Sequence, residues 1–121
     1  MASGTIKAVA SKADIDALNS KMAKHTGSFT SENITVQGEM FVVKFGNVVI
    51  CQLAFKPTTD IAAWTTFCTI PSGYRPAKTV FAADIYGIGF YQINTDGTVM
   101  QSVTMPNASQ RRSNVSAWYV D

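Results

Sequence analysis

"GNVVICQLAF", residues 46–55, carries apolar side chains on both faces of the strand that it predicts. One face holds Val49, Cys51, Leu53 and Phe55, and the other holds Val48, Ile50, Gln52 and Ala54. Successive side chains of a strand point to opposite sides of the sheet, so this strand is expected to be central and covered on both faces. Gly46 and Asn47 form a glycine-led two-residue loop, which predicts a hairpin with "EMFVVKF" at residues 39–45.

Short apolar or alternating runs, separated by turns, fill most of residues 27–121. Further strands are expected at "NITVQ" (33–37), "WTTFCTI" (64–70), "TVFAADIY" (79–86), "FYQIN" (90–94), "TVMQSVTM" (98–105) and "VSAWYV" (115–120). Strands of this length at regular intervals are typical of an antiparallel β-sandwich or barrel, so the sequence predicts an all-β fold. At 121 residues the chain has room for one domain.

Residues 11–27, "SKADIDALNSKMAKHTG", show helical periodicity instead. Ser11 can cap the helix, Asp14 is a short-armed version of the capping-box acid, and Gly27 can end the helix. Apolar or aromatic positions recur at spacings of three, four and three residues, at Ile15, Leu18, Met22 and His25. So narrow an apolar stripe is typical of a coiled coil.

This helix belongs to a predicted neck, residues 1–26, that precedes a β-sandwich head at residues 27–121. A helix this short is marginal in water by itself. We therefore expect it either to pack on its own β domain or to bundle with copies of itself.

Residues 69–81, "TIPSGYRPAKTVF", predict a rigid connection between two strands. Pro71 and Pro76 lack the hydrogen-bond donor of a strand interior, so they mark strand ends. Gly73 can take a positive φ in the turn. Tyr74 is expected to fold back over the end of the sheet, and Arg75 to point into solvent. The stretch is interpreted as structural rather than as a ligand contact.

Together, residues 46–55, "WTTFCTIPSGYRPAKTVF" (64–81) and "FYQINTDGTV" (90–99) resemble the C-terminal head domain of phage and prophage tail-fibre, baseplate and receptor-binding proteins. In that family a Gly-Asn-Val strand leads to a Pro-x-Gly-Tyr/Phe-Arg-Pro turn, followed by an Asp-Gly or Ser-Gly hairpin and a short aromatic terminal strand. The resemblance covers residues 38–121. Residues 105–116, "MPNASQRRSNVS", are more polar and basic than the family pattern.

The resemblance implies a homotrimer, because such heads sit on trimeric shafts, and the neck would be the last turns of a coiled coil. It also implies a place in the virion, at a tail tip, fibre or baseplate, next to other phage tail or baseplate proteins. The head would bind a host cell-surface saccharide or another envelope component. Two alternatives stay open: a purely structural tail-fibre or baseplate module, and a small bacterial lectin or adhesin, which the neck helix disfavours.

Composition restricts the partners further. A net charge of +2 with 15% charged residues is not the footprint of nucleic-acid binding or of a polybasic membrane surface. No apolar run is long enough to span a bilayer and no signal-peptide core begins the chain, so we expect no membrane insertion and synthesis in the cytoplasm of a bacterial host. Cys51 and Cys68 fit no zinc spacing and are expected to be buried free thiols.

Candidate catalytic groups are sparse. The only histidine, His25, lies in the predicted neck. Asp60, Asp84 and Asp96 fall at a loop, a strand and a turn, and nothing local pairs them as glycoside hydrolysis requires. No phosphate loop, serine nucleophile motif or metal-ligand cluster is present. We therefore expect no enzyme and no cofactor or metal.

Polar residues suited to saccharide binding gather in the predicted loop "PNASQRRSN", residues 106–114. The loop offers Asn107, Gln110, Arg111, Arg112 and Asn114, of which the first four are the predicted ligand residues. Tyr86 and Tyr91 flank the "GIG" tip at residues 87–89 and can supply an apolar face for the sugar. We expect these six residues to form a shallow site. The donors of its arginines suit vicinal hydroxyls, phosphate or carboxylate, and an anionic wall polymer would use both guanidiniums.

Other placements of these residues stay open. The two tyrosines also fit the edge of the core or a trimer interface, and the two arginines fit a solvated loop. Trp64 and Trp118 are expected in strands, in the core or at an interface.

Overall fold

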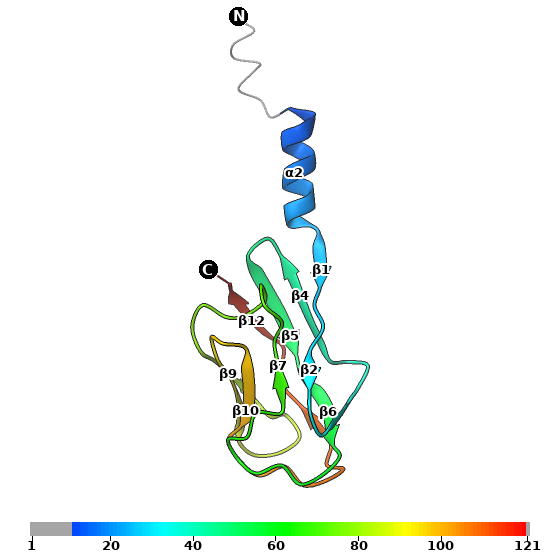
Figure 1. Ribbon diagram of the computed structural model, residues 1–121, viewed down its shortest axis with the longest axis vertical. Helices are drawn as coiled ribbons and strands as arrows, with labels where there is room; N and C mark the ends of the chain where they lie inside the picture. The colour runs from blue at the N-terminus through cyan, green and yellow to red at the C-terminus, as the bar shows by residue number, and fades with distance from the viewer. Residues whose placement is uncertain (1–10, 121) are drawn as a thin grey trace, which may run out of the picture.

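The computed structural model describes residues 11–120, and one helix stands apart from a set of short strands (Figure 1). The elements are α2 (Lys12–Met22), β1 (Lys24–Thr26), β2 (Thr30–Ser31), β3 (Ile34–Val36), β4 (Phe41–Phe45), β5 (Val48–Gln52), β6 (Ala54–Pro57), β7 (Cys68–Thr69), β8 (Val80–Ala83), β9 (Phe90–Ile93), β10 (Thr98–Gln101), β11 (Arg111–Arg112) and β12 (Ser116–Tyr119). The all-β prediction is confirmed, although most strands are shorter than their sequence patterns.

The strands form three sheets in which all pairings are antiparallel. Sheet A has the order β1-β4-β5-β12, sheet B the order β2-β7-β10-β9-β8, and sheet C the order β11-β6-β3. The predicted hairpin at Gly46-Asn47 joins β4 to β5, with Phe45 opposite Val48 and Gly46 at a φ of 61°. β5 is central in sheet A, as the sequence predicts.

The long strand predicted at residues 48–55 bends at Leu53, where the chain passes from sheet A to sheet C. The Leu53 N–H donates to Ser113 Oγ at 2.9 Å, and the Ser113 N–H donates to the Leu53 carbonyl at 2.9 Å. Before the bend, β5 pairs with β12, and after the bend, β6 pairs with β11. Residues 111–112 are therefore a strand, and the prediction that they lie in a polar loop is wrong.

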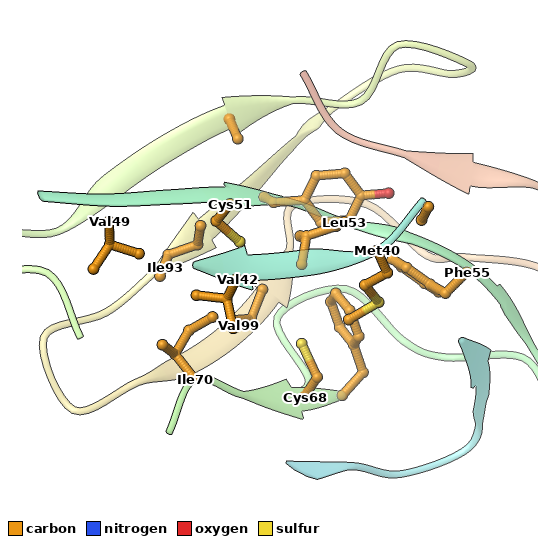
Figure 2. Packing of buried hydrophobic residues seen from close by; sticks show 14 of the residues in the cluster. Met40, Val42, Val49, Cys51, Leu53, Phe55, Cys68, Ile70, Ile93 and Val99 are labelled. Carbon is orange, nitrogen blue, oxygen red and sulfur yellow. The ribbon is translucent and has the colours of Figure 1, made fainter. Parts of the chain in front are cut away.

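The core lies between the facing sides of the sheets, and Figure 2 shows its side chains converging from sheets A and B. The four residues predicted to share one face of the strand, Val49, Cys51, Leu53 and Phe55, are all buried. The Phe55 ring lies 4.7 Å from that of Phe67 and 6.0 Å from that of Tyr91, measured between ring centroids. Burial of these side chains is the main stabilising contribution to the β domain.

The opposite face of β5 is not covered by a further layer. Val48, Ile50 and Gln52 are half-buried, so the prediction that the strand is covered on both faces is wrong for the single chain. An open groove of about 450 Å³ runs over this face, and its apolar lining residues are Phe41, Val43, Phe45 and Ile50. We call these four residues, with Val48, the outer face of sheet A.

The helix begins as predicted but ends early. The Ser11 hydroxyl accepts from the Asp14 N–H at 3.2 Å, and the Asp14 carboxylate accepts from the Ser11 N–H at 3.2 Å, which is the predicted capping box. The helix stops at Met22, and His25 lies in β1 opposite Lys44 of β4. The prediction that His25 continues the helical stripe is wrong, because pairing with β4 holds residues 24–26 in an extended conformation.

Gly27 does not end the helix either. Its N–H donates to the Val42 carbonyl at 2.8 Å, and an added Cβ would lie 3.1 Å from Pro71 and Val42 side-chain atoms. The glycine is needed for this close approach of chain segments.

Figure 1 shows α2 projecting beyond the end of the sheets rather than packing on them. Ile15, on the predicted apolar stripe, is 47% exposed. Packing of the helix on its own domain, one of the two predicted alternatives, is therefore not observed. Residues 1–10 of the predicted neck lie outside the described residues.

The turn after β7 is held by internal contacts. The Tyr74 N–H donates to the Pro71 carbonyl at 3.1 Å, and Gly73 has the predicted positive φ, 89°. The Trp118 indole N–H donates to the Tyr74 carbonyl at 2.8 Å. These contacts fit the predicted structural role of residues 69–81.

Arg75 does not point into solvent as predicted. Its Nε donates to the Ile70 carbonyl at 2.9 Å, and the half-buried side chain lies against Gly97. Gly97 has a φ of 88° in the turn between β9 and β10, and an added Cβ would collide with Arg75 Nε. The arginine therefore links two turns.

The two tryptophans differ in environment. Trp118 lies in β12 and is buried, as predicted for a core residue. Trp64 lies outside any strand, has a φ of 63° and is 50% exposed, so its predicted place in a strand is wrong. Its ring meets that of Phe90 edge-on at 5.8 Å, and Phe90 meets Phe81 in the same way at 5.6 Å.

Candidate functional site

Two segments that are distant in the sequence form an open groove of about 650 Å³ at one end of the β domain. One segment joins β8 to β9, and the other joins β10 to β11. The lining residues are Tyr86, Gly87, Ile88, Val103, Thr104, Pro106, Ser109, Gln110 and Arg111. The predicted site residues Tyr86, Gln110 and Arg111 are therefore brought together.

A buried carboxylate lies beneath this groove. The Asp84 side chain is 0% exposed, and its Oδ2 accepts hydrogen bonds from Tyr91 Oη at 2.9 Å, Gln101 Nε2 at 3.1 Å and Arg111 Nη1 at 3.1 Å. Its Oδ1 accepts from the Tyr86 N–H at 3.0 Å. A buried ion needs such compensation, so these bonds fix the groove-forming segments relative to each other.

From the sequence, Asp84 is predicted only as one of three possible catalytic acids. The signal that could have identified its structural role is a carboxylate at the end of an apolar strand pattern, "TVFAADIY". Such a group requires a buried cation or several donors. The isolated bridge between Asp84 and Ser113 places β11 close enough for Arg111 to be that cation.

Arg111 lies beside the groove with little of its surface exposed. Its side chain is 10% exposed, Nη1 binds Asp84, and Nε donates to Ser109 Oγ at 3.0 Å. An added Cβ on Gly87 would lie 3.0 Å from Nη1, so a side chain there would press on the guanidinium. Neither of these two bonds uses Nη2.

Arg112 points away from the groove lining and makes different contacts. Its Nη2 lies 3.1 Å from Glu39 Oε1, and its guanidinium carbon lies 5.5 Å from the centroid of the Tyr86 ring. Arg112 therefore stacks on Tyr86, which lines the groove, but does not line the groove itself. Its predicted role as a direct ligand contact is not supported by this position.

Tyr91 is fully buried in β9, so its predicted role as an exposed sugar platform is wrong. Burial, followed by the negative charge of Asp84, raises the pKa of the Tyr91 phenol well above its usual value. The alternative prediction, which placed Tyr91 at the edge of the core, is closer to the observed position. The reason is the alternation of β9, which turns Phe90 outward and Tyr91 inward.

Asn107 is exposed but does not line the groove. Its N–H donates to Asp60 Oδ1 at 2.7 Å, and the next residue, Ala108, has a φ of 63°. Asn107 and Gln110 belong to the same predicted polar loop, but of the two only Gln110 lines the groove.

The remaining titratable groups do not converge on the groove. Asp96 accepts hydrogen bonds from the Thr98 hydroxyl and N–H in its own turn, and these bonds lower the pKa of its carboxyl. Among residues 11–120, no three His, Cys, Asp or Glu side chains are grouped so that they could hold a metal ion. In the same range, no helix is sufficiently long and apolar to cross a membrane.

Cys51 and Cys68 are both buried and free, as predicted. Burial raises the pKa of the Cys51 thiol to about 12 and the pKa of the Cys68 thiol well above its usual value. Both thiols therefore behave as small apolar core residues.

Comparison of the chain with protein-family models and with curated proteins finds no match. The ligand class that the groove can bind is therefore inferred from the side chains that line it. It presents the exposed faces of Tyr86 and Ile88 beside the polar groups of Thr104, Gln110 and Arg111. Such a surface can bind a ligand that has both apolar and hydroxyl-bearing sides.

Proposed function

We propose that this chain is the receptor-binding head of a phage tail, which attaches as a homotrimer to a saccharide on the host cell surface. The observation that carries the proposal is the groove in which Tyr86, Gln110 and Arg111 meet. The resemblance of residues 38–121 to phage tail heads supplies the biological setting.

The chemistry of the groove suits a sugar. Tyr86 is 54% exposed and offers an aromatic face to the C–H side of a pyranose, while the Gln110 amide and the Arg111 guanidinium can bind its hydroxyls. The Asp84 network holds the groove-forming segments in place before a ligand arrives. Less conformational entropy is then lost on binding.

The trimer is supported by two surfaces that the single chain leaves without a covering layer. Helix α2 is too short to be stable in isolation, and the apolar outer face of sheet A borders β1, into which the helix leads. A bundle of copies around the helix would cover both surfaces. Three linked grooves would also strengthen the attachment of a weak saccharide site through avidity.

A purely structural tail module is the second candidate. The exposed aromatic row of Trp64, Phe90 and Phe81 on sheet B favours it, because aromatic side chains are enriched at protein–protein interfaces. In that function the groove would have no ligand.

Binding of labelled protein to a panel of bacterial strains tests the receptor function. Tyr86→Ala and Gln110→Ala should each weaken binding to a recognised strain by about tenfold, since each removes a contact worth roughly 1 kcal/mol or more. Asn107→Ala is the matched control, because it removes an exposed amide from the same loop but outside the groove. Undiminished binding by the first two folded variants would place the receptor site elsewhere, and no binding to any strain would favour the structural module.

Sedimentation equilibrium tests the trimer independently of the ligand. The expected mass is three times that of the 13.1 kDa chain. A monomer mass at micromolar concentration would contradict the oligomeric part of the proposal.

We also propose that the head does not hydrolyse its receptor. Asp60, Asp84 and Asp96 have separate structural partners, namely Asn107, Arg111 and Thr98. Incubation with host-wall polysaccharide should release no reducing ends. Release that is lost on mutating any of the three carboxylates would overturn this part.

A further inference from the structure

The charges around the groove indicate which kind of saccharide it takes. We infer that the ligand is an uncharged saccharide rather than an anionic, phosphate- or carboxylate-bearing wall polymer. This inference rests on the proposed receptor function. Of the ligand groups that the sequence leaves open, it keeps vicinal hydroxyls and excludes phosphate and carboxylate.

The first reason is that the charge of Arg111 is already neutralised. Within residues 11–120, Arg111 is the only charged residue that lines the groove, and its Nη1 lies 3.1 Å from Asp84 Oδ2. The Asp84 side chain is completely buried beneath it, so the pair is poorly screened by water. A ligand in the groove therefore meets a hydrogen-bond donor whose positive field is largely cancelled by the carboxylate.

The second reason is that Arg112 is also paired. Its Nη2 lies 3.1 Å from Glu39, and its guanidinium stacks on Tyr86 instead of entering the groove. Glu39 is more exposed than Asp84, so this pair is the weaker one, but the carboxylate still offsets the second positive charge. The adjacent arginines thus form two separate ion pairs, and not a joint anion clamp.

The third reason is the character of the remaining lining. Tyr86, Ile88, Val103 and Pro106 are apolar or aromatic, and Ile88 is 77% exposed at the rim. The polar side chains of Thr104 and Gln110 are neutral and can both donate and accept hydrogen bonds. The neutral Ser109 hydroxyl already donates to the Pro106 carbonyl at 2.6 Å. A phosphate or carboxylate that bound here would lose water against this surface. It would find no unpaired cation to compensate its charge.

The decisive experiment compares neutral and acidic sugars. The folded wild-type protein is applied to an array in which neutral glucan, mannan and galactan oligosaccharides are paired with their phosphorylated, sulfated or uronic-acid forms, with polyglycerol phosphate as an anionic polymer. Binding is expected to the neutral members. Binding confined to the acidic members, or cell binding without binding to either class, would overturn the inference and leave receptor binding intact.

Salt dependence provides a second readout on whole cells. Raising NaCl from about 0.1 M to about 1 M shortens the screening length from about 10 Å to about 3 Å. Attachment to a recognised strain should change by less than about twofold for an uncharged ligand. A loss of about tenfold or more would indicate an anionic ligand and overturn the inference. A protein that binds no strain at either salt concentration would instead contradict the receptor function itself.

Glu39→Gln is the matched charge variant. It removes one negative charge near the groove with little change in shape, and Glu39 does not line the groove. A neutral ligand should bind this variant within about twofold of the wild type at low salt, since no charge on the ligand responds to the change. Tighter binding by about threefold or more at low salt, lost at high salt, would identify an anionic ligand.

Discussion

Helix α2 and the β domain differ in how far their apolar side chains are shielded from solvent. In the helix, Ile15 is exposed although it occupies the apolar stripe, whereas Ile93 in β9 has the same side chain and is completely enclosed by the core. The helix is thus stabilised locally, by its capping box and the Lys12–Asp16 ion pair. The β domain is stabilised by contacts between residues that are far apart in the sequence.

The difference shows that an apolar sequence pattern does not by itself specify which surface will cover it. The β strands find theirs within one chain, while Ile15 of the helix and the outer face of sheet A are left without a covering layer. Changes in the β core should therefore affect the stability of each subunit. Changes in the helix should affect association.

The largest expected effect comes from breaking the ion pair beneath the groove. Arg111→Ala leaves the Asp84 carboxylate buried without its cation and should lower the free energy of unfolding by about 3–5 kcal/mol. Urea unfolding followed by tryptophan fluorescence measures this. A double variant that also carries Asp84→Asn should lose less than the sum of the two single changes, because no unpaired ion remains.

Arg112→Ala is the control from the same strand. It removes a partly exposed ion pair and a guanidinium Nε that is buried without a hydrogen-bond partner among the described residues, so it should cost no more than about 1 kcal/mol. Equal losses for the two arginine variants would contradict the difference between the buried and surface pairs.

The same substitution at the two isoleucines separates the regions directly. Ile93→Ala creates a cavity in the core and should lower the free energy of unfolding by about 2–5 kcal/mol. Ile15→Ala should change the unfolding of the β domain by less than about 0.5 kcal/mol and should instead weaken the proposed trimer. Calorimetry and sedimentation equilibrium measure the two effects, and a large loss of β-domain stability with Ile15→Ala would show that the helix packs on its own sheet.

The thiols give a smaller, kinetic contrast within the β domain. Cys51 and Cys68 should resist iodoacetamide at mildly alkaline pH in the native protein, because burial blocks access and raises the pKa of both thiols. Both should react rapidly in urea, as mass spectrometry can record. Fast modification of the native protein would indicate that the core between sheets A and B opens readily.

The smallest effect is expected at the exposed turn between β9 and β10. Hydrogen bonds from Thr98 lower the pKa of the Asp96 carboxyl in the folded state, so its stabilisation is complete above the unfolded pKa and is lost as the pH falls through the folded pKa. Asp96→Ala should therefore slightly lower the melting temperature at neutral pH and leave it unchanged in strong acid. Melting curves across that range measure the difference, and an equal decrease at every pH would contradict it.

Features set by neighbouring residues were predictable. Ser11 and Asp14 form their capping box within three positions, the hairpin loop falls at Gly46 as expected, and Gly73 takes the expected positive φ. Predictions failed where another segment decided the conformation. Pairing with β4 ends the helix before His25, and β6 draws Arg111 into a strand.

The sequence by itself determined the all-β class, the hairpin and turn positions, and the central place of residues 48–52 in their sheet, because these follow from the two-residue period of a strand and the permitted φ values of glycine. Which face of that strand meets the core was decided by the tertiary structure, since both faces are apolar in the sequence. It also placed Tyr86, Gln110 and Arg111 among the candidate ligand residues. Only the tertiary structure decided which of the six candidates meet. Asp84 and Arg111 are 27 positions apart, and their pairing depends on strand contacts and burial that no local pattern encodes.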